Sequence, residues 1–411
     1  MKKPKIRFKD FTETWEQRKL GDMGSTFTGL SGKNKNDFGH GKAKFVTYMN
    51  VFTNSIANLE MTDNIEIDNK QNEVKYGDVF FTTSSETPDE VGMSSVWLGN
   101  KQNIYLNSFC FGFRPSVKIN EYYLAYMLRS DCVRKKITYL AQGISRYNIS
   151  KNKMMNIEIP LTNYLEQQKI GTLFSELDNL ITLHQRKCEN LKKLKKFMLQ
   201  KLFPQNGENV PKIRFSNFTD TWEQRKLEEI CESFEYGLNA AAKEYDGENK
   251  YIRITDIDDN SHEFIQDDVT SPDIDLTNSE NYQLKYGDVL FTRTGASVGK
   301  TYIYKESDGL VYYAGFLIRG RVKSNYSPEF IFQNTLTDDY DKFIRITSQR
   351  SGQPGVNAQE YASYEISVPK FEEQQKIGAY FSTLDHLITL HQSKCDNLKE
   401  LKKYMLQNMF I

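Results

Sequence analysis

The chain contains the same sequence pattern twice, and this repetition constrains its fold more than any other feature. Residues 166–203 read EQQKIGTLFSELDNLITLHQRKCENLKKLKKFMLQKLF, and residues 373–410 read EQQKIGAYFSTLDHLITLHQSKCDNLKELKKYMLQNMF. A second block obeys the same offset of 207 residues, because KIRFKDFTETWEQRKL at 5–20 returns as KIRFSNFTDTWEQRKL at 212–227. The 411-residue chain is therefore a tandem duplication, and its fold must accommodate two similar units.

The segments between these blocks have diverged. Residues 45–60 and 251–266 share almost nothing, although both copies keep a KYGDV segment, which begins at Lys75 and at Lys285. A constant framework around two unlike inserts indicates one task carried out on two different targets. We expect four segments, namely globular domains at 1–163 and 211–371, a helix with a linker at 164–210 and a C-terminal helix at 372–411.

Each insert reads as short strands rich in β-branched and aromatic residues, separated by turns and followed by a helix. The expected strands are residues 44–51, 79–83 and 103–114 in the first copy and 251–255, 289–293 and 312–322 in the second. The expected helices are 121–140 and 328–348, and Pro328 suits the first turn of the latter. The predicted fold class is mixed α/β (α+β), with two globular domains of duplicated plan.

The bulk composition excludes several classes of protein. Lys plus Arg and Asp plus Glu both total 54, so the net charge of zero carries no general sign of nucleic-acid binding, but residues 1–160 sum to +6 and residues 211–370 to −9. The five cysteines are scattered without a CxxC spacing, which predicts neither a disulfide framework nor a zinc site. No signal peptide or membrane span is legible, so we expect a soluble, cytoplasmic protein without a membrane partner.

Apolar residues in the repeated segment step by three or four positions, as in an amphipathic helix. The opposite face carries lysines, and the average step is close to the coiled-coil period. Because each stripe is too apolar for an isolated helix, we predict that the two helices pack antiparallel as a coiled coil, a rod of about 54 Å. The predicted interface consists of Leu177, Leu180, His184, Cys188, Leu191, Leu194 and Met198, with Leu384, Leu387, His391, Cys395, Leu398, Leu401 and Met405.

No residue pattern in the chain predicts catalysis or a metal site. The stretch GASVGKT at 295–301 has three residues between its glycines where a phosphate loop has four. The carboxylate of Glu73 is replaced by Gln283 in the second copy, which argues against a duplicated nuclease centre. His184 and His391 lack neighbouring ligands on their helices, so we interpret them as interface residues.

Two loops, residues 142–151 and 349–357, stand out because both precede the last strand of a copy and combine glycine with Arg, Asn, Ser or Gln. Such side chains read base edges, Arg on guanine and Asn or Gln on adenine. The ends of the strands near 83 and 293 form a second candidate edge, and the basic run at 134–136 suits phosphates, although a solvated helix face explains it nearly as well. The predicted DNA contacts are Ser84, Ser85, Arg146, Tyr147, Asn148, Lys151, Arg293, Thr294, Lys300, Arg350, Gln353 and Asn357.

These features together resemble a known family. The duplicated plan, the segment GDVLFTRTGASVGK at 287–300, and the entries IPLTNYLEQQKIG and VPKFEEQQKIG into LDxLITLHQxKCxNLKxLKK resemble the DNA specificity subunit of type I restriction-modification systems. The resemblance covers essentially the whole chain. In that family two target-recognition domains each read one half of a split site on double-stranded DNA, and the paired helices space them. The first copy departs from the pattern, since it reads FFTTSSETPDEVGM where the second has the fuller segment.

The resemblance also implies partners and cofactors. Two methylation subunits that use S-adenosylmethionine dock on the specificity subunit, and endonuclease subunits driven by ATP with Mg²⁺ join the complex. The chain itself would then be a non-catalytic subunit without a cofactor of its own. A protein scaffold with two interaction domains on a rod remains the alternative from another class. A nuclease with its own metal site would need the purified chain to cut DNA alone.

Overall fold

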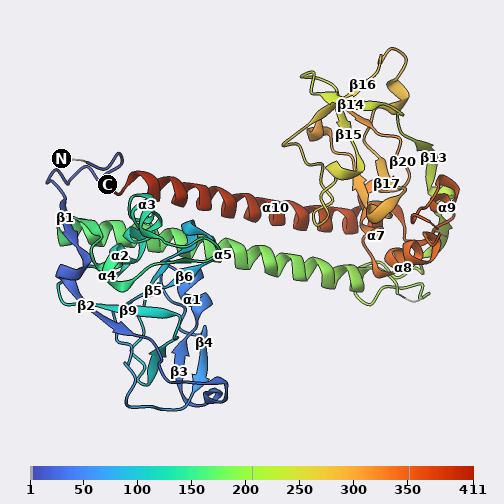
Figure 1. Ribbon diagram of the computed structural model, residues 1–411. Coiled ribbons are helices and arrows are strands. Elements are labelled where there is room, and N and C mark those ends of the chain that lie inside the picture. Colours follow the sequence, from blue (N-terminus) through green and yellow to red (C-terminus); the bar gives the residue numbers. More distant parts are fainter. Residues whose placement is uncertain (1–2, 206, 351) are drawn as a thin grey trace. The chain divides into compact units, whose positions relative to one another are not determined.

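The computed structural model describes residues 3–205, 207–350 and 352–411 (Figure 1). The chain divides into two compact units: unit 1 comprises Met1–Gln185 with Ser393–Ile411, and unit 2 comprises Arg186–Gln392. Each unit thus combines one globular region with a part of each long helix. The four-segment division expected from the sequence remains a prediction about domains, because the compact units cut through both helices.

Unit 1 contains two small sheets and two short ladders. The four-stranded antiparallel sheet has the order β2 (Gly24–Thr28), β9 (Cys110–Pro115), β5 (Val79–Thr82), β7 (Ser94–Val96). The three-stranded sheet has the order β4 (Thr62–Ile65), β3 (Phe38–Val46), β8 (Ile104–Leu106), with β3 and β8 parallel. The ladders join β1 (Glu16–Lys19) to β11 (Glu158–Leu161) and β6 (Ser84–Ser85) to β10 (Tyr147–Asn148).

Short helices complete unit 1 and connect the sheets to the long helix. They are α1 (Tyr48–Thr53), α2 (Glu121–Met127), α3 (Asp131–Leu140) and α4 (Lys151–Met155), with 3₁₀ turns η1 (Leu20–Met23), η2 (Lys35–Asp37) and η3 (Pro88–Glu90). The largest core lies between the four-stranded sheet, α2, α3 and the first turns of the long helix α5, and includes Phe81, Phe111, Tyr126 and Phe174. The three-stranded sheet lies on the side of unit 1 away from α5 (Figure 1).

Unit 2 repeats this plan with different details. Its four-stranded antiparallel sheet has the order β13 (Cys231–Tyr236), β20 (Leu317–Val322), β17 (Asp288–Thr292), β18 (Thr301–Ile303). A second sheet, β14 (Ala241–Glu244), β16 (Thr270–Asp273), β15 (Lys250–Ile252), β19 (Val311–Tyr313), has β15 and β19 parallel. The ladder of β12 (Glu223–Lys226) with β21 (Glu365–Val368) matches β1 with β11.

Short helices and 3₁₀ turns complete unit 2, as they do unit 1. They are α6 (Leu227–Ile230), α7 (Pro328–Asn334), α8 (Asp338–Thr347) and α9 (Ala358–Ala362), with 3₁₀ turns η4 (Ile254–Asp256), η5 (Glu280–Tyr282), η6 (Gly295–Ser297) and η7 (Glu306–Asp308). Helix α7 begins as expected, because Ser327 Oγ accepts from the Phe330 amide and Pro328 occupies the first turn. The core of unit 2 again packs the four-stranded sheet and the short helices against the long helices.

The boundaries of several expected elements were wrong. The strand expected at 44–51 ends at Val46, because Thr47 caps α1 through its hydroxyl oxygen, which accepts from the Asn50 amide at 3.3 Å. The strands expected at 103–114 and 312–322 are each two strands, and the helices expected at 121–140 and 328–348 are each two helices. In the first helix pair, Ser130 interrupts the backbone with a hydroxyl that donates to the Met127 carbonyl.

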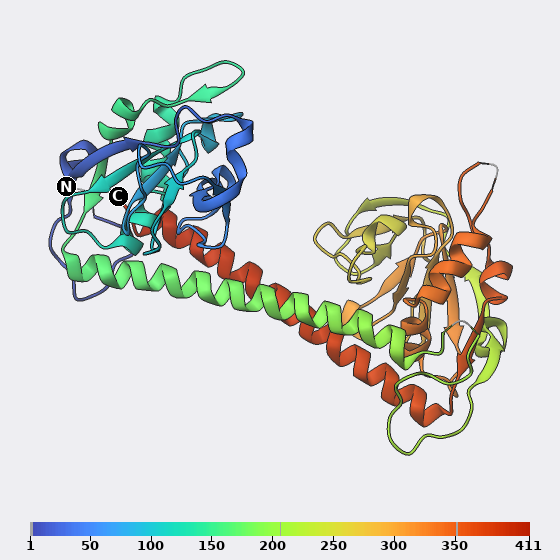
Figure 2. The ribbon, with the colours of Figure 1, turned by 90° about the horizontal axis from the view of Figure 1, so that it is seen from below.

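The long helices are α5 (Tyr164–Leu202) and α10 (Phe371–Asn408), and they run antiparallel within each unit (Figure 2). In unit 1, Lys402 Nζ lies 2.5 Å from Asp178 Oδ1. In unit 2, Lys195 Nζ lies 2.6 Å from Asp385 Oδ1. These two ion pairs occupy equivalent positions of the repeat, and each joins α5 to α10. The predicted fold class, mixed α/β domains with an antiparallel coiled coil, is confirmed.

Part of the predicted helix interface was wrong. Leu180, Leu194 and Leu401 are exposed. The covered positions alternate by four and three residues through Leu177, Ile181, His184, Cys188, Leu191 and Lys195, which is the regular heptad. Periodicity favoured Leu194 over Lys195, but the lysine is half-buried because its aliphatic stem packs in the seam while its ammonium reaches Asp385.

The other predicted interface residues lie in this seam. Leu177, Cys188, Leu384 and Cys395 are buried, and the rest are half-buried, namely His184, Leu191, Met198, Leu387, His391, Leu398 and Met405. Cys188 Sγ lies 3.6 Å from Gln392 Oε1 in unit 2, and all five cysteines are reduced. Among the described residues no helix is long and apolar enough to cross a membrane, and no cluster of His, Cys, Asp and Glu could hold a metal ion.

Candidate nucleic-acid interface

In unit 1, the two segments that the sequence singled out separately form one structure. Strand β6 follows β5 directly and pairs antiparallel with β10, with Tyr147 opposite Ser85 and Asn148 opposite Ser84. The Ile149 amide donates to the Thr83 carbonyl at 3.0 Å and extends this ladder. The loop before the last strand is therefore attached to the end of the central strand β5.

Unit 2 makes the equivalent connection with a different sequence. Thr294 forms a β-bridge with Gly355, and the Gly295 amide donates to the Pro354 carbonyl at 3.1 Å. The Val356 amide donates to the Arg293 carbonyl at 2.9 Å. Both units thus carry a variable loop fastened to the end of a constant strand, and we call this surface the reading edge. Its unit 2 loop contains Ser351, which lies outside the described residues.

The loop of unit 1 is a hairpin that projects from the body of the unit (Figure 2). Gln142 and Asn148 exchange two backbone hydrogen bonds, at 3.0 and 2.8 Å, and close the loop between them. Gly143 has φ +149°, and a side chain there would lie about 2.0 Å from the Arg146 carbonyl oxygen. At the tip Ile144 is 98% exposed, and Arg146 is exposed as well. The hairpin therefore presents an apolar and a cationic side chain to solvent.

Several predicted contact residues instead hold the reading edge together. Ser84 and Ser85 are buried, and Ser85 Oγ donates to Glu90 Oε2 at 3.1 Å. The Ser84 carbonyl accepts from the Tyr48 hydroxyl at 2.9 Å. The ladder and its neighbours cover the side chains of both serines, and their contact with DNA stays a prediction.

In unit 2, two more predicted contacts serve the loop itself. The Arg350 guanidinium binds both carboxylate oxygens of Glu360, at 2.5 and 2.7 Å. Asn357 Oδ1 accepts from the Glu360 amide and the Glu360 carboxylate accepts from the Asn357 amide, which forms a capping box at the start of α9. Ser150 caps α4 at the equivalent position in unit 1. Arg350 and Asn357 are thereby engaged within the chain.

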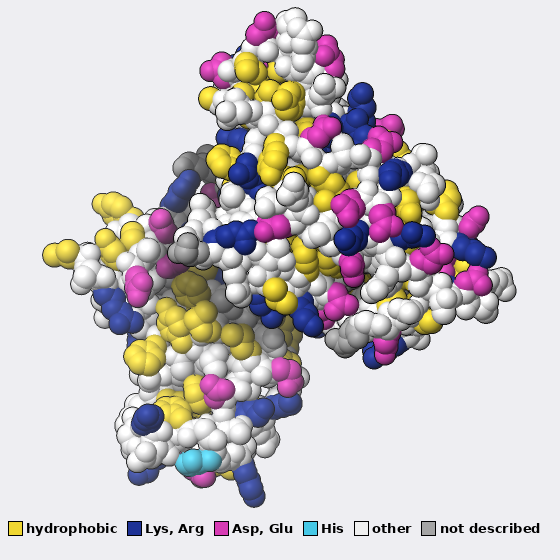
Figure 3. All heavy atoms as spheres, turned by 90° about the vertical axis from the view of Figure 1, so that its right-hand side faces the viewer, with side chains coloured by type: hydrophobic (Ala, Val, Ile, Leu, Met, Phe, Trp, Pro, Cys, Tyr) yellow, Lys and Arg dark blue, Asp and Glu magenta, His cyan; other side chains and the backbone are white. Residues whose placement is uncertain are grey.

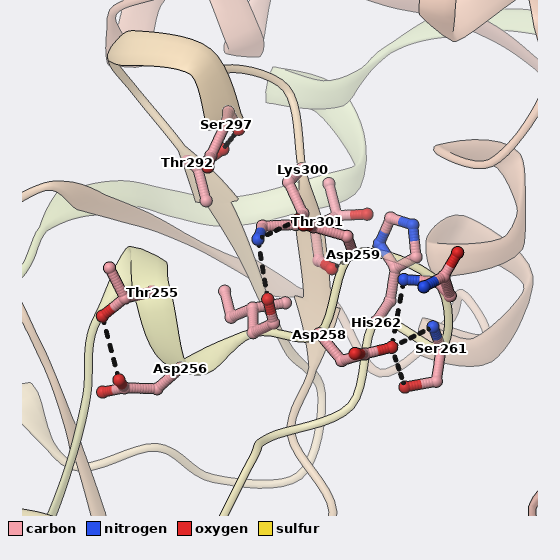
Figure 4. Close-up of polar contacts among 12 residues, drawn as sticks. Thr255, Asp256, Asp258, Asp259, Ser261, His262, Thr292, Ser297, Lys300 and Thr301 are labelled. Atoms are coloured by element: carbon pink, nitrogen blue, oxygen red, sulfur yellow. Dashed lines mark hydrogen bonds and ion pairs between the residues drawn. The ribbon is translucent and has the colours of Figure 1, made fainter. Parts of the chain in front are cut away.

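Lys300 is also engaged internally (Figure 4). Its ammonium donates to Asp259 Oδ1 and to the Ile257 carbonyl, both at 2.7 Å, and its side chain is only 11% exposed. The Thr292 hydroxyl donates to the Ser297 carbonyl across the same turn. These contacts hold the turn at 295–300 against the segment 257–259, and contact of Lys300 with DNA stays a prediction.

The basic run of unit 1 has a structural role as well. The Arg134 guanidinium donates to the carbonyls of Asp89, Val91 and Gly92 at 2.7 to 2.9 Å, and burial lowers its pKa to about 10. Lys136 Nζ donates to the Glu158 carbonyl at 2.7 Å. Arg134 thus holds the segment after β6 in place and Lys136 binds β11, whereas Lys135 between them is exposed.

The remaining predicted residues stay at the reading edge. Arg146, Asn148 and Gln353 are exposed, and Tyr147, Lys151 and Thr294 are partly exposed. Arg293 is partly buried, with its guanidinium 4.9 Å from the centre of the Tyr236 ring. Two exposed aromatic residues of this edge, Phe109 and Phe316, were missed by the sequence reasoning, although both stand at the repeat offset of 207 residues.

Both signs of charge are mixed on the surface of unit 2. Figure 3 shows lysine and arginine interspersed with aspartate and glutamate on the face that it presents. On that face, the acidic residues of this half of the chain are therefore mixed with cations rather than gathered in one negative patch.

The two copies each match the sequence model of one family, described as the type I restriction modification DNA specificity domain, at residues 12–193 and 219–400. The chain belongs to the family of type I restriction-modification specificity subunits. The two matched domains coincide with the two copies of the repeat, so this specificity subunit has two target-recognition domains of one plan.

Two relatives of this specificity subunit come from Methanocaldococcus jannaschii. The MjaX specificity subunit is 26% identical over 234 residues, which are 54% of each chain, so the specificity subunit spans about half the length of that relative. The MjaVIII specificity subunit is 24% identical over 362 residues, 83% of this chain and 80% of the relative.

Solved structures show the same fold. The S subunit of a type I restriction-modification system from M. genitalium is 16% identical, with a TM-score of 0.66 over 100% of this chain and 99% of the other. A chain from a study of complex assembly and conformational transition of the type I R-M system has a TM-score of 0.52 and 18% identity, with 96% and 97% of the chains covered. At these low identities, the structural likeness shows the fold of the specificity subunit alone.

Proposed function

We propose that this specificity subunit reads a bipartite, asymmetric site on double-stranded DNA, one half with each unit. The observation that carries the proposal is the reading edge, which has the same backbone attachment in both units and different side chains. Two domains of the same fold that recognise different sequences need a loop attached in the same way but carrying different side chains. It also explains why the inserts have diverged while the blocks around them have not.

The side chains that we assign to this task are those left exposed or partly exposed at the edge. In unit 1 they are Arg146, Tyr147, Asn148 and Lys151, and in unit 2 they are Arg293, Thr294 and Gln353. Arg binds the two acceptors of guanine, whereas Asn and Gln bind adenine through their amides. Lysine adds a phosphate contact that positions the unit on the duplex.

The paired helices are proposed to set the distance between the two half-sites and to bind the partner subunits. They have 39 and 38 residues, enough for a rod about 57 Å long. Exposed apolar residues recur on both at the repeat offset: Leu183 with Leu390, Leu194 with Leu401, and Phe197 with Tyr404. Similar apolar surfaces in two copies suit two identical methylation subunits.

In this proposal the reactions belong to the partners. The methylation subunits bind S-adenosylmethionine, endonuclease and translocase subunits bring ATP and Mg²⁺ through the complex, and the chain stays a non-catalytic, cytoplasmic subunit. Methylation of the two half-sites is then the measurable consequence of what each unit reads.

The test is methylome sequencing of cells that carry the complete system. Replacing Arg146 and Asn148 by alanine should change one half-site only, and Gln353→Ala should change the other. Arg350→Ala is unsuitable, because it would also remove the ion pair with Glu360, a residue of the capping box of α9. If either variant altered both half-sites, the assignment of one half to each unit would be refuted. Absence of any methylated motif, with the partner subunits still bound, would favour the scaffold instead.

A further inference from the structure

Each unit exposes one phenylalanine at its reading edge. Phe109 precedes β9 and is 61% exposed, and Phe316 precedes β20 and is 59% exposed. The two residues are separated by 207 residues, the offset of the repeat. Their neighbours differ, since the first copy reads NSFCF and the second AGFLI. An aromatic side chain thus stands at the same position of two inserts, between neighbours that differ.

The backbone of each phenylalanine is fastened to the strand end that carries the variable loop. In unit 1, the Thr83 amide and hydroxyl both donate to the Phe109 carbonyl, at 3.1 and 2.9 Å. In unit 2, the Arg293 amide donates to the Phe316 carbonyl at 3.1 Å. Thr83 and Arg293 also accept hydrogen bonds from the variable loops, at Ile149 and Val356. One residue therefore connects the loop and the phenylalanine in each unit.

The aromatic position is also held rigidly from behind in unit 1. The Phe109 amide donates to Asn107 Oδ1 at 2.9 Å, and the buried Asn107 side chain donates to the Val46 carbonyl at 3.0 Å. A fixed backbone spares the cost of ordering the chain when a ligand binds. The backbone position from which the ring projects is thus fixed at the reading edge.

A single exposed phenylalanine is ordinary on a protein surface, but two at equivalent positions beside two reading loops point to a shared ligand. Every base has an aromatic face, so a phenyl ring can stack on DNA of any sequence. This property explains why the ring is common to both units while the loops, which distinguish bases, are not.

We propose that Phe109 and Phe316 each insert against a base step of the half-site read by their own unit, and stack on the bases there. This inference rests on the proposed function of the reading edge. The rings supply affinity and local unstacking of the duplex without choosing the sequence. The loops Gln142–Asn148 and 349–357 supply the choice.

The experiment uses the complex of the full specificity subunit with its methylation subunits, and a duplex containing the motif found by methylome sequencing. Phe109→Ala and Phe316→Ala should each weaken binding by about 5- to 100-fold at fixed salt, measured by fluorescence anisotropy. Phe109→Trp should bind nearly as the unmodified complex. Because both side chains are exposed, circular dichroism of the variants should be unchanged.

Matched controls lie at the opposite ends of the same strands. Tyr76 and Tyr286 are exposed aromatic residues that precede β5 and β17, whereas Phe109 and Phe316 contact the residues after those strands. Tyr76→Ala and Tyr286→Ala should leave DNA affinity within about twofold, which is a difference of about 0.4 kcal/mol. Equal losses in the controls would overturn the inference.

A second readout separates stacking from a structural role. 2-Aminopurine placed at adenines of one half-site, other than the methylated one, should brighten when the complex unstacks it. Phe109→Ala should abolish this signal in one half-site only, and Phe316→Ala in the other. Suppose that the unmodified complex binds the motif better than a scrambled duplex, and that both variants show the same affinity and the same 2-aminopurine signal as the unmodified complex. In that case only this inference fails. If the unmodified complex does not discriminate, the proposed function fails with it.

Discussion

Arg7 donates two parallel hydrogen bonds to the carboxylate of Glu166, at 2.7 and 2.8 Å, and Glu166 is completely buried. Arg214 and Glu373 repeat this pair in unit 2 with the same distances. The N-terminal arm of each copy is thereby bound to the first turns of a long helix. The pairing accounts for the two constant blocks of the sequence, since each block supplies one partner of a buried, bidentate ion pair.

Breaking this pair should destabilise unit 1 strongly. Arg7→Ala leaves the Glu166 carboxylate buried without its cation, and we expect a loss of about 3 kcal/mol in the free energy of unfolding. Urea unfolding followed by circular dichroism measures it. Lys169→Ala, which removes the exposed ion pair with Asp10, should change stability by less than about 1 kcal/mol. A similar loss in both variants would show that the burial of the pair is unimportant.

Two adjacent residues test the helix seam. Ile181 is 8% exposed and Leu180 is 43% exposed. Ile181→Ala should lower the free energy of unfolding by about 2–4 kcal/mol, because it leaves a cavity between the helices, whereas Leu180→Ala should change it by less than about 0.5 kcal/mol. The same urea titration compares them. A larger loss of stability in Leu180→Ala than in Ile181→Ala would support the interface expected from periodicity.

The exposed apolar positions should matter for assembly instead of folding. Leu194→Ala and Leu401→Ala should leave the unfolding transition unchanged, because both side chains are exposed. Each should weaken the binding of one of two methylation subunits by about tenfold, which corresponds to about 1.4 kcal/mol. Analytical ultracentrifugation of the purified components would detect a complex with one methylation subunit at concentrations below those that form the full assembly. Unchanged assembly in the double variant would refute these positions as docking residues.

His262 should make the stability of unit 2 dependent on pH. Burial lowers the pKa of its imidazole, and the nearby ammonium groups of Lys195 and Lys300 act in the same direction. Its Nδ1 donates to the Thr301 carbonyl at 2.8 Å, which opposes part of the shift. Because the folded state favours the neutral ring, the stabilisation is complete above the ordinary histidine pKa of about 6.5 and is lost as pH falls below it.

The measurement compares urea unfolding at pH 7.5 and 5.5 for the unmodified chain and for His262→Gln. The unmodified chain should lose more stability at acid pH than the variant, which cannot be protonated at this position. An equal loss in both would assign the pH dependence to other groups.

Local residue patterns predicted much of the local structure. The β5 strand, the first turn of α7 and the two long helices follow from patterns that neighbouring residues decide, such as β-branched runs, Pro328 after a serine cap and the heptad. The seam was harder to predict, because Lys195 occupies a position where periodicity favours leucine. Only the carboxylate of Asp385, far away in the chain, makes that lysine suitable.

The sequence predicted which segments form the reading edge, but not which of their side chains are engaged within the chain. Arg350, Asn357 and Lys300 have the residue types that bind nucleic acids, yet each is engaged by a partner within the chain. Phe109 and Phe316 lack a polar group and were passed over, although their exposure beside the loops makes them candidates.

The sequence by itself determined that the chain is two copies of one plan joined by pairing helices, since blocks repeated at a constant offset form the same local structures. The tertiary structure alone decided which residues of the variable loops stay available to a ligand. Availability depends on long-range partners, such as Glu360 for Arg350 and Asp259 for Lys300, and no local pattern of residues reveals which partner the fold will supply.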